Sequence, residues 1–241
     1  MTLSLISSSL VAPGMDFQTG AFVVAFLILS LGIHEAAHAW VANLCGDSTA
    51  KDMGRLTLNP IPHIDPLMTI LLPAALILSG SGFIFGGAKP VPVLYSRLRQ
   101  PARDMMLVAL AGPISNILIA IVLLLATKIL VYTGGMSMGQ LAPQVLIMSV
   151  RFNLLLAVFN MIPVPPLDGS RVLAYLLPSS LRPSFQALDR YSMLLIFVLV
   201  MDPFTGVAPK RLRGRVYQSA QSVSALADSR PATPRGFAPA R

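Results

Sequence analysis

Residues 21–33 form an apolar run that continues, without a turn signal, into three ionisable residues. The run AFVVAFLILSLGI leads directly to His34, Glu35 and His38 in the segment HEAAH. If one helix spans both parts, His34 and His38 lie one turn apart on the same face, about 40° from each other around the axis. Ionisable side chains in an apolar span are costly and need partners, so this pattern indicates a functional site inside a membrane helix.

The composition favours a membrane protein. Of the 241 residues, 54% are hydrophobic and only 12% are charged, which is about half the charged fraction of a soluble domain. Residues 206–241 carry most of the net positive charge of +8. A basic tail beside a membrane suits anionic lipid, so we expect a lipid bilayer as partner and no nucleic acid.

The apolar runs predict an all-α polytopic membrane protein with about four to five transmembrane helices and one re-entrant segment. Spans are expected at about residues 17–44, 104–132 and 143–162, and a shorter run, 191–201, is the weakest candidate. Glycine and proline breaks within residues 67–86 favour a segment that enters the membrane and returns to the side it left.

Two basic clusters flank this re-entrant segment and set the expected orientation. They comprise Lys51 and Arg55 before it and Lys89, Arg97, Arg99 and Arg103 after it. If the segment crossed the bilayer, the two clusters would lie on opposite sides; if it returns, both lie on the cytoplasmic side, which agrees with the positive-inside bias. We expect residues 1–205 to form one membrane domain and residues 206–241 a basic, disordered C-terminal tail.

The segment HEAAH matches the pattern H-E-x-x-H. Two imidazoles at this spacing can hold one zinc ion, and the glutamate between them lies near enough to take a proton from a water molecule bound there. The chain has three histidines and one glutamate, and two of the histidines and the glutamate fall within five residues. The alternative is a polar patch that packs against another helix, which is rare in so apolar a span.

A catalytic zinc site needs a third protein ligand, for which His63 and the aspartates are the candidates. Asp168 is the strongest of them. It lies in NMIPVPPLDGS, directly after a span, where three prolines and a glycine interrupt the helix. Such a break can turn a side chain inward, and an unpaired carboxylate at that depth would be costly. The alternative is that Asp168 caps the helix that follows.

Together the two motifs resemble the site-2 protease family of intramembrane zinc metalloproteases. The chain is most similar to the compact bacterial group that lacks a PDZ domain. The segments GRLTLNPIPHIDP, GGAKPVPV and ALAGPISN also resemble that group's intervening motifs, and the likeness covers about residues 17–178. Ser170 stands where the family commonly has a second glycine, and the group often has an aromatic residue near Gly87; neither departure touches a predicted ligand.

The resemblance implies that His34, His38 and Asp168 are the ligands of one zinc ion and that Glu35 is the catalytic base. Asn160, which opens the second motif, would bind the substrate backbone; an interhelical hydrogen bond is its alternative role. The implied activity is that of an intramembrane zinc metalloendopeptidase of the regulated intramembrane proteolysis type. Its substrates would be membrane-spanning or membrane-tethered proteins, its location the bacterial inner membrane, and its active site would face the cytoplasmic side.

Other segments allow more than one interpretation. The alternating prolines of KPVPV, residues 89–93, favour extended backbone to which an unwound substrate strand could add, or an ordinary exposed connector. Ala111 and Ser115 favour close helix packing, and Asn116 could support the metal site through a hydrogen bond. His63 is expected to be a loop or interfacial histidine.

Two other classes of function compete with the protease. A non-catalytic membrane protein could keep the fold and bind partners, but the intact His34, Glu35, His38 and Asp168 argue against it. A metal transporter would spread its ligands over several helices with repeat symmetry, and the chain has no internal repeat.

Overall fold

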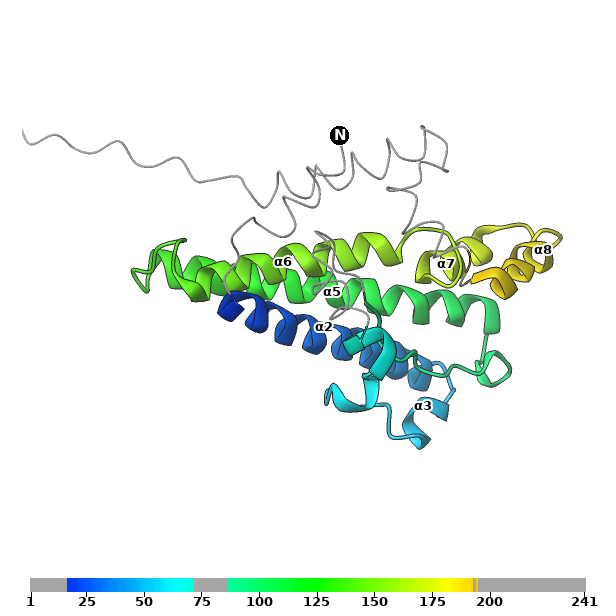
Figure 1. Cartoon of the computed structure of the whole chain (residues 1–241). Coiled ribbons are helices and arrows are strands. Elements are labelled where there is room, and N and C mark those ends of the chain that lie inside the picture. The colour runs from blue at the N-terminus through cyan, green and yellow to red at the C-terminus, as the bar shows by residue number, and fades with distance from the viewer. Residues whose placement is uncertain (1–16, 72–85, 193, 195–241) are drawn as a thin grey trace, which may run out of the picture.

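A computed structural model describes residues 17–71, 86–192 and 194 of the chain, and these residues contain helices and no strand (Figure 1). Three helices are long: α2 (Phe17–Leu44), α5 (Pro101–Tyr132) and α6 (Leu141–Asn160). The short α-helices are α3 (Thr49–Asp52), α7 (Asp168–Leu176) and α8 (Arg182–Gln186). Further helical turns are η1 (Ile61–His63), η2 (Pro66–Leu71), η3 (Tyr95–Arg97) and η4 (Ala187–Tyr191).

The three long helices are long and apolar enough to cross a membrane, so the predicted class of polytopic helical membrane protein is confirmed. They correspond to the spans predicted at residues 17–44, 104–132 and 143–162. Most of the short run predicted at residues 191–201 lies outside the described residues, which end at Leu194, and so does the whole C-terminal tail. The total number of spans and the division of the chain at residue 205 therefore stay predictions.

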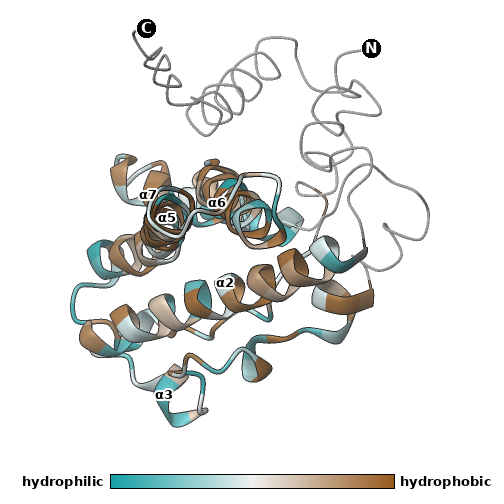
Figure 2. Cartoon of the chain, turned by 90° about the vertical axis from the view of Figure 1, so that its left-hand side faces the viewer, coloured by the Kyte–Doolittle hydropathy of each residue, from teal (hydrophilic) through white to brown (hydrophobic). Residues whose placement is uncertain are grey.

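Helix α5 is the centre of the bundle. It packs against α2 on one side and α6 on the other, and α2 also contacts α6. The buried core between them contains Ala120, Leu123 and Val150. Large apolar side chains of α5, among them Leu118, Val122 and Leu125, are exposed, and much of the ribbon of the long helices carries the brown of hydrophobic residues (Figure 2). Such an outward apolar surface suits lipid rather than water.

Helices α6 and α7 lie end to end along α5, separated by a break over residues 161–167. Three prolines in the break cannot continue a helix. Gly169, in the first turn of α7, lies against the end of α6: a Cβ on Gly169 would be 2.2 Å from the carbonyl oxygen of Met161. Glycine thus lets α7 begin close to the carbonyls of Met161 and Ile162, the first two residues of the break, which determines where Asp168 lies.

The chain segments around the predicted re-entrant segment meet at one end of the bundle. The N–H of Arg99 donates to the carbonyl of Cys45 at the end of α2, and the N–H of Gly87 donates to the carbonyl of Met68. The two basic clusters therefore lie at the same end. Met68 and Gly87, on either side of the predicted re-entrant segment, are hydrogen-bonded to each other, and a segment that returns to its own side requires such neighbours. Residues 72–85 themselves lie outside the described residues.

Candidate metal centre

Helix α2 carries His34 and His38 on the face that packs against α5, and both side chains are buried. Their Nε2 atoms are 3.0 Å apart, and their rings meet edge to face, with planes at 87°. Gly112 of α5 backs onto both rings: a Cβ there would lie 2.4 Å from His34 Cε1 and 2.5 Å from His38 Nε2. Only a glycine allows α5 to pass this close to the two imidazoles.

Asp168, at the start of α7, brings the second motif to the two histidines. Its Oδ2 is 3.4 Å from His34 Nε2 and its Oδ1 is 3.4 Å from His38 Nε2. It is the first residue of α7 rather than its N-cap, which is Leu167, and the N-cap has no side-chain hydrogen bond. The structure therefore does not support the capping alternative.

These three side chains fit a tetrahedral metal ion. Zinc–nitrogen bonds of about 2.0–2.1 Å require neighbouring ligand atoms about 3.3–3.4 Å apart, and the distances among His34, His38 and Asp168 are 3.0, 3.4 and 3.4 Å. Two imidazoles and one carboxylate are also a donor set that zinc accepts. The fourth corner of such a tetrahedron would remain for water or substrate.

The protonation of His38 supports the same conclusion. Its Nδ1 lies 2.7 Å from the carbonyl oxygen of Val108. A carbonyl can only accept, so Nδ1 carries the proton and, in the neutral ring, Nε2 presents a lone pair. That lone pair faces the Asp168 carboxylate, whose buried Oδ2 has no hydrogen-bond partner among the described residues. Electron-rich atoms facing one another in a buried site need a proton or a metal ion between them.

His34 has a comparable partner on α5. Its Nδ1 is 3.2 Å from Nδ2 of Asn116, which is completely buried. The oxygen and nitrogen of an amide are interchangeable in such an assignment. When His34 Nε2 binds a metal, Nδ1 carries the proton and donates it to Oδ1 of Asn116, an atom that otherwise lacks a partner. Asn116 therefore lies where it can support the metal site through a hydrogen bond to His34, as the sequence suggested.

Glu35 lies beside this group without belonging to the triangle of donors. Its carboxylate and the ring nitrogens of His34 and His38 lie within 4.8 Å of one another. Oε2 of Glu35 accepts a hydrogen bond of 2.9 Å from the N–H of Val91. The carboxylate is therefore held in place by the backbone of residues 86–94, a segment without regular secondary structure.

The remaining predicted residues lie elsewhere. Asn160 is the last residue of α6, just before the break that leads to Asp168, and it is half-buried. His63 is buried in η1, where its Nε2 lies 3.1 Å from the carbonyl of Thr57. This agrees with the prediction of a loop histidine.

Gly112 and Val108 are the site residues that sequence reasoning missed. The sequence drew attention to Ala111 and Ser115 as small residues on this helix, but the residue that touches the histidines is Gly112 between them. A glycine directly before a proline in the middle of a long apolar helix was the available signal. The carbonyl of Val108 left no signal, because a backbone group depends on no particular side chain.

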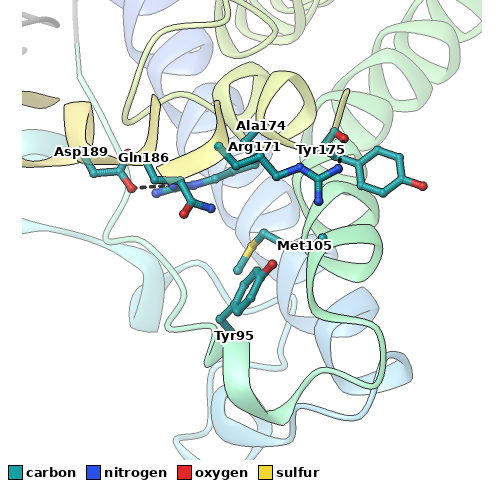
Figure 3. Close-up of a pocket in the computed structure, with 9 residues that line it drawn as sticks. Tyr95, Met105, Arg171, Ala174, Tyr175, Gln186 and Asp189 are labelled. Carbon is teal, nitrogen blue, oxygen red and sulfur yellow. Dashed lines mark hydrogen bonds and ion pairs between the residues drawn. The ribbon is translucent and has the colours of Figure 1, made fainter. Parts of the chain in front are cut away.

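A separate hollow of about 260 Å³ opens along the outer part of α7 (Figure 3). It is lined by Tyr95, Ala102, Met105, Arg171, Ala174, Tyr175, Arg182, Gln186 and Asp189. Arg171 pairs with Asp189 at 2.6 Å, and Arg182 donates to the carbonyls of Tyr175 and Leu177. Both arginines are therefore engaged within the protein, and none of the predicted site residues lines this hollow.

The comparisons with known proteins agree with the two motifs. Residues 125–201 match peptidase family M50. The chain is similar to the "Putative zinc metalloprotease YwhC" of Bacillus subtilis, with 38% identity over 76% of this chain and 81% of the relative. It is also similar to the "Putative zinc metalloprotease Rip2" of Mycolicibacterium smegmatis, with 29% identity over 83% of this chain and 74% of the relative.

A more distant relative is archaeal. The "Putative zinc metalloprotease MJ0611" of Methanocaldococcus jannaschii is 27% identical over 73% of this chain and 82% of its own length. Among solved structures, none matches the chain significantly. The identity with the Bacillus relative extends over most of both proteins, and the chain therefore belongs to peptidase family M50, the site-2 protease family that its two motifs resemble.

Proposed function

We propose that this zinc metalloprotease of family M50 is an intramembrane endopeptidase. Its substrates would be membrane-spanning or membrane-tethered proteins, as in regulated intramembrane proteolysis. The observation that carries the proposal is the convergence of His34, His38 and Asp168 at 3.0–3.4 Å, with Glu35 beside them. Helix α2, which carries His34, Glu35 and His38, is long and apolar enough to cross a membrane, which supports cleavage within the membrane.

In this proposal His34, His38 and Asp168 hold one zinc ion. The bound ion supplies a Lewis acid that polarises the substrate carbonyl and lowers the pKa of a water molecule. Glu35 accepts the proton of the attacking water and then delivers it to the leaving amine. The hydrogen bond from Val91 keeps one oxygen of Glu35 occupied, so the other oxygen carries the proton.

Substrate binding is assigned to residues around the break between α6 and α7. Asn160 precedes this break, and its amide can hydrogen-bond the backbone of an extended substrate. The segment at residues 89–93 has no regular secondary structure, and the N–H groups of Lys89 and Val91 already bond the carbonyl of His63 and the carboxylate of Glu35. A substrate strand could therefore add only along the other edge of this segment, where Pro90 and Pro92 have no N–H to offer.

We also propose a bacterial inner-membrane location with the active site toward the cytoplasmic side. Five exposed basic residues lie at the end of the bundle where α2 ends and α5 begins: Lys51, Lys89, Arg97, Arg99 and Arg103. Positive charge of this kind favours the cytoplasmic face. His34 lies ten residues before the end of α2, about 15 Å along the helix. Water would reach this depth through a protein-lined path.

The first prediction concerns Glu35. In the Glu35→Gln variant we expect zinc content to be unchanged, because the amide replaces a group outside the ligand set. Cleavage of a model transmembrane peptide should fall by about 10²–10⁴-fold, the range for loss of a general base. Metal analysis of the purified protein and a gel-based cleavage assay check both parts.

His34→Ala and Asp168→Ala should instead reduce bound zinc as well as cleavage. Asp52→Asn is the matched control, since Asp52 is an exposed carboxylate of α3 that accepts a hydrogen bond from Ser48. If Glu35→Gln cleaves as fast as the parent protein, Glu35 is not the base. A parent protein purified without stoichiometric metal would favour a non-catalytic role.

A further inference from the structure

Among the described residues, three charged side chains outside the metal centre are buried; one, Asp104, accepts the N–H of Gln100 at the start of α5, and the other two are Asp47 and Arg55. Asp47, just after α2, is completely buried, and Arg55, in the loop after α3, is only 6% exposed. Burying a charged group is unfavourable unless its hydrogen bonds are satisfied. Both side chains bind the backbone of the same segment, residues 86–94, which we call the strap.

Asp47 holds the C-terminal end of the strap. Its Oδ2 accepts the N–H of Leu94 at 2.6 Å, and its Oδ1 accepts the N–H and the hydroxyl of Thr49 at 3.0 and 2.5 Å. Burial raises the pKa of Asp47, but these hydrogen bonds outweigh it, and the pKa lies below its usual range. The carboxylate therefore stays charged and ties the strap to the start of α3.

Arg55 holds the strap at Lys89 and Pro90, on the other side of Val91 from Leu94. Its Nη2 donates to the carbonyls of Lys89 and Pro90, both at 3.0 Å, and its Nη1 donates to the carbonyl of Pro62. The N–H of Lys89 in turn donates to the carbonyl of His63 at 2.8 Å. A single guanidinium thus joins the strap to η1.

Val91 lies between these two anchors, and its N–H is the group that meets Oε2 of Glu35 at 2.9 Å. The neighbouring Pro90 and Pro92 have no N–H, so the strap offers Glu35 one donor at this place. The strap belongs to no helix or sheet. Its position therefore depends on side chains that bind it, and the buried charges that bind it on either side of Val91 are the strongest of these.

We propose that Asp47 and Arg55 are positioning residues, which hold the strap so that the N–H of Val91 fixes the carboxylate of Glu35 for proton transfer. The inference rests on the proposed role of Glu35 as base. A glutamate has three rotatable bonds, and fixing it in one orientation raises the fraction of molecules ready to react. Neither residue touches the predicted metal ligands, so both act through Val91.

The test uses Arg55→Lys and Asp47→Asn in the full chain, each with a matched control. Lysine keeps the charge but cannot serve three carbonyls in the same fork geometry. Arg103→Lys and Asp52→Asn change an exposed arginine and an exposed aspartate nearby. We expect kcat on a transmembrane peptide to fall by about 10- to 100-fold, with KM and zinc content unchanged. Hydrogen exchange should become faster in the strap and not in α2 or α5.

A third variant tests whether the effect passes through Val91. Val91→Pro removes the N–H that meets Glu35 and keeps extended backbone. It should lower kcat to a similar extent, and adding Arg55→Lys should lower kcat little further, because both changes act on one contact. If Asp47→Asn does not accumulate as folded protein, Arg55→Lys and Val91→Pro carry the test.

Three results would overturn the positioning role. The first is an unchanged kcat in a variant whose strap shows faster hydrogen exchange. The second is a reduced kcat without faster hydrogen exchange in the strap. The third is that the effects of Val91→Pro and Arg55→Lys on kcat multiply, as independent changes would. Failure of the proposed function is separate and is read from Glu35→Gln. If Glu35→Gln is inactive while Arg55→Lys cleaves normally, only the positioning role is wrong.

Discussion

The backbone carbonyl of Val108 and the amide of Asn116 determine how the two histidines can bind a metal. Each contacts an Nδ1 atom, at 2.7 and 3.2 Å, so that both Nε2 atoms turn toward Asp168. Both groups come from α5, the same helix whose Gly112 leaves space for the rings. At the scale of single residues, α5 contributes no predicted metal ligand, and yet it orients two of the three predicted ligands, His34 and His38.

Asn116 can be tested against a second buried asparagine. Asn153 is equally buried, but it bonds Ser30 and the carbonyl of Ser149 rather than a histidine. Both Asn116→Leu and Asn153→Leu are expected to change stability. Only Asn116→Leu should weaken zinc binding, by about 10- to 100-fold, the usual effect of losing a hydrogen bond to a ligand. Competition with a zinc chelator measures the difference; equal zinc affinities of the two variants would contradict it.

The helical elements bring the two motifs together through a break. The helix stops at Asn160 because of the prolines that follow, and α7 begins at Asp168 against the last carbonyls of the preceding segment. In an uninterrupted helix, the helical repeat alone would determine the direction in which Asp168 points and its distance along the helix from the histidines. The break gives the chain freedom to turn Asp168 toward α2 while α7 continues to pack on α5.

Gly169→Ala tests this element. A Cβ at Gly169 would lie 2.2 Å from the carbonyl oxygen of Met161, so α7 must move away from the break. Overpacking of this kind costs about 1–3 kcal/mol, and the shift should carry Asp168 away from the histidines. We expect lower thermal stability together with weaker zinc binding. Gly139→Ala is the control, because the nearest atom to its Cβ is 3.8 Å away; retention of full zinc affinity in Gly169→Ala would contradict the proposed geometry.

At the scale of the whole molecule, the proposed zinc ion joins elements that otherwise meet mainly through α5. Helix α2 supplies His34 and His38, and α7 supplies Asp168, while each of these helices has its most extensive contacts with α5. A ligand that binds the folded state and not the unfolded state stabilises the protein according to its concentration and affinity. Metal should therefore contribute to the stability of the bundle as well as to the chemistry.

Removal of metal should lower the unfolding temperature in detergent. Free zinc at 100 times its dissociation constant stabilises a folded protein by about 2.7 kcal/mol, and chelation should abolish that amount until zinc is restored. Glu35→Gln should respond to zinc like the parent protein, whereas Asp168→Ala should show little response. A parent protein whose unfolding temperature ignores both chelator and zinc would contradict a metal bridge between α2 and α7.

Local patterns account for the parts that could be predicted from the sequence. The three long helices follow from apolar runs, and the pair His34 and His38 follows from a spacing of four residues on one helix. The break before Asp168 follows from its prolines. The strap was expected to be extended, but its contacts with Asp47, Arg55 and Glu35 were not predicted, because they join residues far apart in the chain and leave no periodic signal.

The sequence by itself determined the membrane class, the helical spacing of the histidines and the broken helix before Asp168, since each depends on neighbours within a few residues. Only the tertiary structure decided that Gly112 and Asn116 face the histidines, that Asp168 comes within 3.4 Å of both, and that Val91 meets Glu35. The physical reason is that these contacts depend on how α2, α5 and α7 pack, and packing selects partners by shape and by unsatisfied polar groups over the whole chain.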